Sequence, residues 1–162
     1  MTQISTGEIT FAFCDYTNEE HCKQLAALIN QYIADPMGGG TPLTPIQQLK
    51  LVDGLAKHPS SFVLFILSDE QIVGLATCFI NFSTFSAKSV INIHDLIIDQ
   101  RYRGKGLGRK LIQTIEDIAK ERKYGKITLE VRADNYPAQK LYYDQGFTEG
   151  KSKMYFWTKE LS

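Results

Sequence analysis

The sequence has 162 residues, the length of one ordinary domain, and its composition excludes a disordered chain and a collagen-like repeat. Eighteen Lys and Arg residues balance eighteen Asp and Glu residues, so the formal net charge is zero. Proteins that coat nucleic acid or an anionic membrane usually carry a basic excess, so neither partner is predicted. We therefore expect a single domain, residues 1–162, in which any charge-driven binding comes from a local patch.

The cysteine pattern predicts reduced thiols, and the N-terminal sequence argues against secretion. Cys14, Cys22 and Cys78 form no C-x-x-C pair and their number is odd, which argues against a secreted disulfide framework. Cys14, His21 and Cys22 lie close in sequence but do not match a zinc-ligand spacing, so no metal is predicted. The first eight residues lack the basic and apolar segments of a signal peptide, and no apolar run is long enough to span a bilayer. We expect a cytoplasmic protein.

The first half of the sequence predicts a strand, two helices and a hairpin. Thr17 and Glu20 have the spacing of a capping box, and apolar residues then recur every three or four positions, which indicates an amphipathic helix. Thr44 followed by proline marks the start of a second helix. The expected elements are a strand at 9–13, helices at 17–35 and from 44 onward, and antiparallel strands at 62–67 and 71–82.

The second half alternates strand and helix. Leu107, Leu111 and Ile115 share one face of a strongly amphipathic helix. The expected elements are strands at 90–98, 126–131 and 154–157, and helices at 106–122 and 137–145. A strand–helix–strand connection makes its two strands parallel, whereas the earlier hairpin is antiparallel. The sequence therefore predicts an α/β fold with a mixed sheet.

The most informative stretch is residues 101–108, Arg-Tyr-Arg-Gly-Lys-Gly-Leu-Gly, between a strand and a helix. Glycines let the backbone approach a ligand, and the N–H groups at a helix start attract anions, so the stretch predicts a phosphate or pyrophosphate site. No Ser or Thr follows Lys105, which excludes a P-loop. The glycine spacing fits a dinucleotide fingerprint poorly, although Glu130 could imitate its ribose-binding acid, which keeps an NAD-dependent enzyme as an alternative.

Two motifs resemble the GNAT superfamily of N-acetyltransferases. Arg101-x-x-Gly104-x-Gly106 is similar to the superfamily signature R/Q-x-x-G-x-G/A. A second motif is similar over Asn135-x-x-Ala138-x-x-Leu141-Tyr142-x-x-x-Gly146-Phe147. The detailed resemblance covers residues 90–147, and earlier elements match only in their order. It implies an α/β (α+β) fold with a mixed, mostly antiparallel central sheet, helices on both faces and a splayed central strand pair.

The resemblance implies acetyl-CoA as co-substrate, bound between the strands at 90–98 and 126–131, and no metal. The pyrophosphate would lie on the glycine-rich loop, and the backbone of residues 96–98 would pair with the pantetheine arm as an added strand does. The residues that the resemblance assigns to acetyl-CoA are Leu96, Ile97, Ile98, Arg101, Arg103, Gly104, Lys105, Gly106, Leu107, Gly108, Arg109, Asn135 and Tyr142.

The resemblance also implies that a primary amine attacks the thioester directly, which needs an acid and a base. Tyr142 stands where the superfamily places the acid for the CoA thiolate; a core tyrosine is the alternative. His94 stands where many members carry Glu, and an imidazole can act as a general base at neutral pH. The alternative is a structural histidine. Asp95, expected on the opposite face of the strand, would orient neighbouring groups or anchor the next loop. Glu130 is a third, weaker candidate base.

The sequence says less about the acceptor. The loop at Gly38–Gly40 is either a lid hinge or a connector, and Phe79, Phe82 and Phe85 either line an acceptor pocket or pack as core and loop. A small-molecule amine and a peptide amine both fit, and a homodimer stays open. The alternative to an enzyme is an acyl-CoA-binding sensor on the same fold that transfers nothing.

Overall fold

The computed structural model describes residues 7–162. Its elements are β1 (Ile9–Phe13), α1 (Glu19–Ala34), α2 (Pro45–Lys57), β2 (Ser61–Ser68), β3 (Gln71–Ser83), β4 (Lys88–Ile98), the short 3-10 helix η1 (Gln100–Tyr102), α3 (Leu107–Glu121), β5 (Lys126–Leu129) and α4 (Tyr136–Asp144). Most of the segment examined for a signal peptide lies outside the described residues. Within 7–162, none of the helices combines the length and apolar character needed to cross a bilayer.

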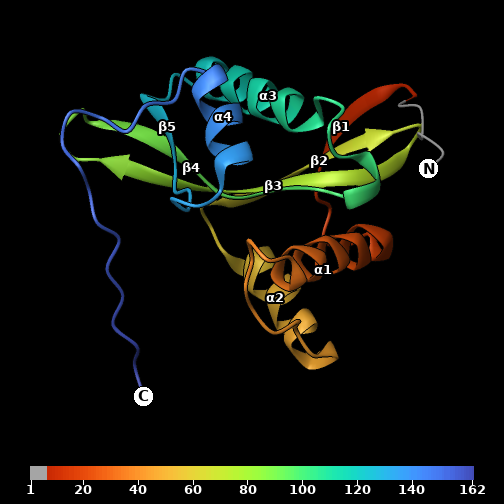
Figure 1. Cartoon of the computed structure of the whole chain (residues 1–162). Helices are drawn as coiled ribbons and strands as arrows, with labels where there is room; N and C mark the ends of the chain where they lie inside the picture. The colour runs from red at the N-terminus through yellow and green to blue at the C-terminus, as the bar shows by residue number, and fades with distance from the viewer. Residues whose placement is uncertain (1–6) are drawn as a thin grey trace.

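The strands form one sheet in chain order, β1-β2-β3-β4-β5. The first four pair antiparallel, and β5 joins β4 in parallel after the crossover through α3. Figure 1 shows α1 and α2 on one face of the sheet and α3 and α4 on the other. The predicted mixed, mostly antiparallel sheet with helices on both faces is therefore confirmed.

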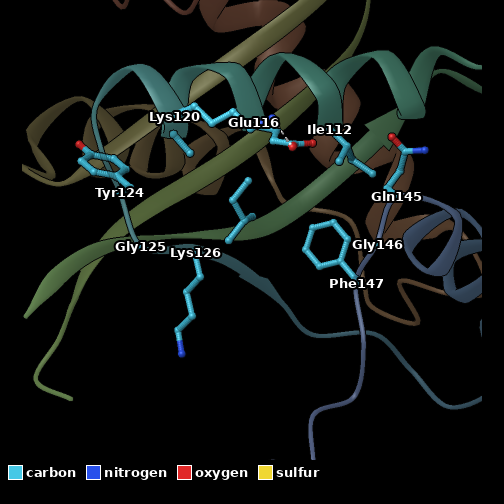
Figure 2. Close-up of a pocket in the computed structure, with 11 residues that line it drawn as sticks. Ile112, Glu116, Lys120, Tyr124, Gly125, Lys126, Gln145, Gly146 and Phe147 are labelled. Carbon is cyan, nitrogen blue, oxygen red and sulfur yellow. Dashed lines mark ion pairs between the residues drawn. The ribbon is translucent and has the colours of Figure 1, made fainter. Parts of the chain in front are cut away.

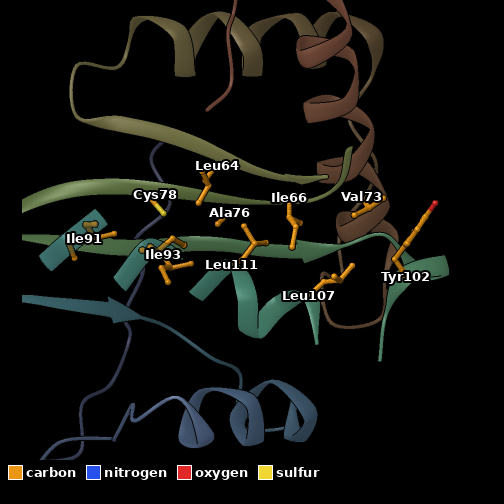
Figure 3. Close-up of a cluster of buried hydrophobic side chains, with 12 residues drawn as sticks. Leu64, Ile66, Val73, Ala76, Cys78, Ile91, Ile93, Tyr102, Leu107 and Leu111 are labelled. Atoms are coloured by element: carbon orange, nitrogen blue, oxygen red, sulfur yellow. The ribbon is translucent and has the colours of Figure 1, made fainter. Parts of the chain in front are cut away.

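The core on the α3 side depends on one stripe of that helix. Leu107, Leu111 and Ile115 are almost completely buried and pack in one cluster with Ile91 and Ile93 of β4. Figure 3 shows Leu107 and Leu111 of α3 facing side chains from β2 and β3. The spacing of the apolar residues predicted this buried face, which the structure confirms.

The opposite face is covered by α1 and α2, whose starts are fixed by side-chain caps. Thr44 caps α2, and Gln47 completes the predicted capping box. The cap of α1 is Asn18, whose Oδ1 accepts from the N–H groups of Glu20 and His21 at 2.9 and 3.2 Å. The prediction of Thr17 as this cap was wrong by one residue.

The strand predicted at 154–157 does not form. Met154, Tyr155, Phe156 and Trp157 are between 72% and 86% exposed, and no strand lies beside them. Figure 1 shows this C-terminal segment running away from the sheet. An alternating apolar pattern supplies the faces of a strand, but a strand also needs a partner for its backbone groups.

We predict that Leu111→Ala lowers the free energy of unfolding by about 2–5 kcal/mol, because it removes a buried side chain and leaves a cavity. Leu49→Ala on α2 is the matched control, since Leu49 is 72% exposed, and its effect should stay within about 0.5 kcal/mol. Urea unfolding followed by circular dichroism measures both. Equal losses in the two variants would contradict the burial pattern.

Candidate active site

The candidate site begins where β4 separates from β5. The parallel ladder joins Val90–Ile93 to β5 and ends there, while β4 continues to Ile98. At the same point the ladder between β3 and β4 skips His94, because Thr77 pairs with Asp95 and Cys78 pairs with Ile93. A bulge of this kind bends a strand and increases its twist. The splayed strand pair that the sequence implied is therefore present, and it opens at His94.

The bulge also turns His94 and Asp95 toward the same face of the sheet. Ile93 packs on the α3 side but Ile97 packs on the α1 side, so the alternation reverses across His94. His94 lies edge-on to Phe79 on the α1 side, with ring centroids 5.4 Å apart. The prediction that His94 and Asp95 point to opposite faces was wrong, because it assumed a regular strand.

A cavity of about 540 Å³ lies beside the part of β4 that β5 does not cover, within the range of small-molecule sites. The residues predicted to bind acetyl-CoA that line it are Leu96, Ile97, Ile98, Arg103, Gly104, Gly106, Leu107, Gly108, Arg109, Asn135 and Tyr142. Two predicted residues do not line it. Arg101 makes a two-pronged ion pair with Asp99 at 3.0 and 2.9 Å, and Lys105 lies over the ring of Tyr102.

The N-terminus of α3 faces this cavity without a side-chain cap. Gly106 occupies the cap position in the left-handed region, with φ of 76°, and the first turn of α3 contains no acidic residue. In contrast, Asn18, Thr44 and Asn135 cap α1, α2 and α4. Among residues 7–162, no side chain caps the first N–H groups of α3, so these groups suit an anion. A β-carbon at Gly104 or Gly106 would meet no atom within 4 Å, so the surface above the loop is open.

An ion pair ties the glycine-rich loop to the end of α1. Arg103 Nη1 lies 3.0 Å from Asp35 Oδ2, and Arg103 Nε donates to the Ile98 carbonyl oxygen at 3.0 Å. The N–H of Met37 donates to Asp35 Oδ1 at 3.0 Å. This hydrogen bond and the Arg103 guanidinium hold the pKa of Asp35 below its ordinary value. The side chain of Arg103 is thus used to position the loop.

The glycines after Asp35 form a tight turn on α1. The N–H groups of Gly38 and Gly39 donate to the Asp35 carbonyl oxygen at 2.9 Å, and Gly40 donates to Ile33 at 3.0 Å. A β-carbon at Gly38 would overlap the carbonyl oxygen of Tyr32. Of the two predictions for this loop, these bonds favour a connector fixed to α1 over a lid hinge.

Tyr142 lies on α4, at the wall of the cavity. Burial, with a contribution from nearby Tyr32, raises the pKa of Tyr142 to about 12. Its hydroxyl therefore stays protonated at neutral pH and can donate a proton without bringing a charge into the site. Its ring lies edge-on to Phe147, with centroids 5.9 Å apart, which helps to fix its orientation.

Tyr32 also lines the cavity, and sequence reasoning did not assign it to a site. Burial raises the pKa of Tyr32, Asp95 and Asp35 add to this effect, and Arg132 opposes it. Tyr32 is therefore close enough to both carboxylates to feel their charge. In the sequence, Tyr32 belongs to the apolar pattern of α1, which predicted a core residue near the end of the helix.

The candidate bases lie beside the cavity and do not line it. Burial raises the pKa of Asp95, while His94 and the hydroxyl of Thr77 oppose the shift. His94 is exposed next to Asp95. Glu130 lies across the strands, where Asn92 Nδ2 donates to its carboxylate at 3.2 Å. His94 thus lies close enough to Asp95 to influence its charge, whereas the carboxylate of Glu130 accepts a hydrogen bond from Asn92.

The remaining sequence candidates lie outside the cavity. Phe82 and Phe85 are exposed at the end of the β3–β4 hairpin, while Phe79 lies against His94. Burial raises the pKa of the Cys14 and Cys78 thiols to about 12, which fits inert, reduced cysteines. In the part of the chain that the structure describes, no three His, Cys, Asp or Glu residues are grouped to hold a metal.

A second, smaller cavity of about 310 Å³ lies between α3 and β5. Figure 2 shows Ile112 of α3, Tyr124 before β5, and Phe147 after α4 around this space. Ile127 of β5 also lines it. It contains no residue of the glycine-rich loop, so it is separate from the candidate site.

The sequence profile of the acetyltransferase (GNAT) family matches residues 16–147, which include β4, the glycine-rich loop and α4. The chain belongs to this family. The family match agrees with the resemblance found from the two motifs, and it extends that resemblance over α1, α2 and the hairpin.

Curated relatives and solved structures agree with this assignment. An uncharacterized N-acetyltransferase of Archaeoglobus fulgidus is 35% identical over 52% of this chain and 58% of its own length. A putative [ribosomal protein bS18]-alanine N-acetyltransferase of Bacillus subtilis is 29% identical over 64% of this chain and 65% of its own length. The chain thus spans less than two thirds of each. A crystal structure of a probable acetyltransferase shares the fold, with 24% identity, a TM-score of 0.77, and coverage of 96% of this chain and 98% of that chain.

We predict that Asp35→Asn destabilises the protein at neutral pH. The folded pKa of Asp35 is lowered, so its contribution is present above the unfolded value of about 3.9 and is lost as the pH falls through the folded value. The difference from the wild type should therefore shrink below about pH 4. Unfolding curves at several pH values measure this.

The matched control is Asp53→Asn, which removes the exposed pair with Lys57 on α2. Its effect should stay within about 0.5 kcal/mol at every pH. A loss in Asp35→Asn that does not change with pH would show that the carboxylate charge is not what ties the loop to α1.

Proposed function

We propose that this GNAT-family chain is an N-acetyltransferase that transfers the acetyl group of acetyl-CoA to a primary amine. The observation that carries the proposal is the uncapped N-terminus of α3, which faces the cavity beside the uncovered part of β4. An anion-binding helix end next to an unpaired strand edge suits a ligand that has a pyrophosphate followed by an amide-containing arm.

The residues of the cavity fit acetyl-CoA along its length. The N–H groups of Leu107 and Gly108 would hold the pyrophosphate, with the guanidinium of Arg109 beside them. The backbone of β4 from Leu96 to Ile98 has lost β5 as a partner and would pair with the amides of pantetheine. The opposite wall is α4, whose N-cap, Asn135, lines the cavity.

Bound acetyl-CoA would supply a thioester carbonyl that an amine can attack. An ordinary primary amine has a pKa near about 10.4, so a base must take its proton before or during attack. As the C–N bond forms and the C–S bond breaks, the sulfur needs a proton, which we assign to the Tyr142 hydroxyl. The raised pKa of Tyr142 keeps that proton available, and the phenolate is then reprotonated from solvent.

We assign the base to His94, acting directly or through a water molecule. The bulge places His94 and Asp95 on one face, so that the Asp95 carboxylate can stabilise the imidazolium that forms. Burial raises the pKa of Asp95. Carboxylates with a shifted pKa beside a second titratable group are typical of active sites. Glu130 is a weaker choice because its carboxylate accepts from Asn92.

The acceptor is proposed as a small-molecule or peptide amine. Support comes from relatives whose names point to each class: the putative alanine N-acetyltransferase, and a putative phosphinothricin acetyltransferase of Bacillus subtilis, 29% identical over 77% of both chains. Tyr32, which lies near Tyr142 and Asp95, is the residue best placed to meet an acceptor amine or its neighbouring groups.

Thermal unfolding with acetyl-CoA, CoA, NAD and ATP in parallel tests the cofactor. A ligand at 100 times its Kd adds about 2.7 kcal/mol, so acetyl-CoA and CoA should raise Tm by about 5–10 °C. Gly106→Ala should weaken acetyl-CoA binding by about tenfold, because a β-carbon in the left-handed region costs about 1–2 kcal/mol and the loop must move.

Gly54→Ala within α2 is the matched control for this loop variant. Gly54 also has free space around its β-carbon position, but it lies in a helix, so alanine should stabilise the fold by about 0.5–1 kcal/mol and leave binding unchanged. A Tm rise with NAD or ATP and none with acetyl-CoA would overturn the proposed function.

Tyr142→Phe should lower turnover by about 10²–10⁴-fold, because the leaving sulfur loses its acid, while acetyl-CoA affinity changes little. Thiol release with a panel of amines measures turnover. Tyr143→Phe is the control, since the neighbouring Tyr143 is 75% exposed and its activity should be that of the wild type. Unchanged turnover in Tyr142→Phe would remove Tyr142 from the mechanism, and no turnover in the wild type would favour an acyl-CoA sensor.

The base is tested by the pH dependence of kcat/KM in His94→Ala and Asp95→Asn. A base must be deprotonated to act, so wild-type kcat/KM should rise with pH along an acidic limb. His94→Ala should flatten this limb, whereas Asp95→Asn should lower the rate and keep the limb. The reverse pattern would assign the base to Asp95, whose pKa burial already raises.

A further inference from the structure

The ring of His94 differs from the other two histidine rings in how it is held. His21 Nδ1 accepts from the N–H of Asp15 at 3.0 Å, and His58 Nδ1 accepts from the N–H of Ser60 at 3.3 Å. Within residues 7–162, neither ring nitrogen of His94 has a hydrogen-bond partner. Both nitrogens therefore stay free for an acceptor amine or a water molecule, but another contact must set the direction of the ring.

Phe79 of β3 supplies a contact of this kind. The ring centroids of Phe79 and His94 lie 5.4 Å apart, and the ring planes meet at 85°. Perpendicular rings at this separation are a favoured arrangement of aromatic side chains. The bulge leaves His94 outside the β3–β4 ladder, so no residue directly across the ladder aligns its side chain. The contact with Phe79 is therefore the one that can orient the candidate base.

Phe79 is itself firmly held. It packs against the buried cluster on the α1 side of the sheet, which includes Leu75 and Ile97. Its backbone lies inside the sheet, because it pairs with Ser61 of β2 on one side and Asn92 of β4 on the other. A residue in close-packed surroundings changes its position little, so Phe79 is a suitable support for an exposed ring.

A third ring continues this series of contacts to α2. His58, the C-cap residue of α2, lies edge-on to Phe79, with ring centroids 5.0 Å apart and ring planes at 78°. The hydrogen bond from Ser60 fixes the His58 ring. The end of α2 is therefore connected to the candidate base through the ring of Phe79.

We propose that Phe79 is a positioning residue for the base, and that His58 steadies Phe79 from the end of α2. The proposal rests on the proposed function, in which His94 takes the proton of the amine. A misplacement of about 1 Å can cost about 10²-fold in rate, so a contact that holds one ring orientation contributes to turnover without touching the substrate. All three rings lie outside the cavity proposed for acetyl-CoA, so cofactor binding should not depend on them.

Phe79→Leu should lower kcat by about tenfold or more, because the imidazole is still present but is no longer held in one direction. The KM for acetyl-CoA should stay unchanged, and the acidic limb of the pH profile should remain because His94 is intact. Phe79→Tyr keeps the ring and should retain the wild-type kcat. Phe82→Leu is the matched control, since Phe82 lies on the same strand, is 64% exposed, and should leave kcat unchanged.

A double-mutant cycle separates positioning from a general effect on the fold. In the His94→Ala background, Phe79→Leu should cause no further loss of kcat, because no base is left to position. His58→Leu should lower kcat less than Phe79→Leu does, and the two losses should not add. Urea unfolding checks that each variant is folded. Equal losses from Phe79→Leu with and without His94, or a loss in Phe79→Tyr as large as in Phe79→Leu, would overturn the positioning role.

NMR of the full chain tests the ring contact without any turnover. In the wild type, nuclear Overhauser effects should join the ring protons of His94 and Phe79. Phe79→Leu should shift the ring signals of His94, while those of His21, which lies edge-on to Phe65, stay in place. His94 signals that do not change would overturn the positioning role, whatever the activity. Shifted signals in a protein that acetylates no amine would confirm the contact and overturn the proposed function on which the role rests.

Discussion

One extra residue in β4, His94, bends the strand away from β5, and the candidate site depends on the space that results. The parallel ladder ends at Ile93, the residue before the bulge, and β4 continues alone from there to Ile98 along the cavity. The same bulge brings His94 and Asp95 to one face, where a base and a carboxylate can act together. A single irregularity thus positions both the proposed cofactor site and the proposed base.

The glycine-rich loop and that space together form the proposed anion site. Gly106, the residue before α3, has a left-handed backbone conformation and no side chain with which to cap the helix. The first N–H groups of α3 are therefore directed at the cavity. Arg103 and Asp35 hold the loop against α1 through an ion pair. The start of α3, in the proposed cofactor site, is therefore tied to the end of α1 by this contact.

The sequence was sufficient to predict the features that depend on contacts between neighbouring residues. The stripe of Leu107, Leu111 and Ile115, the Thr44 cap and the open glycine loop all follow from neighbouring residues. The bulge at His94 could not be predicted, because it depends on how β3 pairs with β4 across the sheet. The strand predicted at 154–157 failed for a related reason: its pattern is correct, but a strand exists only with a partner.

The proposed function requires that the start of α3 bind the pyrophosphate of acetyl-CoA. The most direct measurement is a titration of the isotopically labelled chain with acetyl-CoA, following backbone amide signals by NMR. If the start of α3 binds the pyrophosphate, the amides of Leu107, Gly108 and Arg109 should shift most. Binding at the start of α3 would be contradicted if these amides stayed in place while those beside the smaller cavity, such as Tyr124 and Phe147, moved instead.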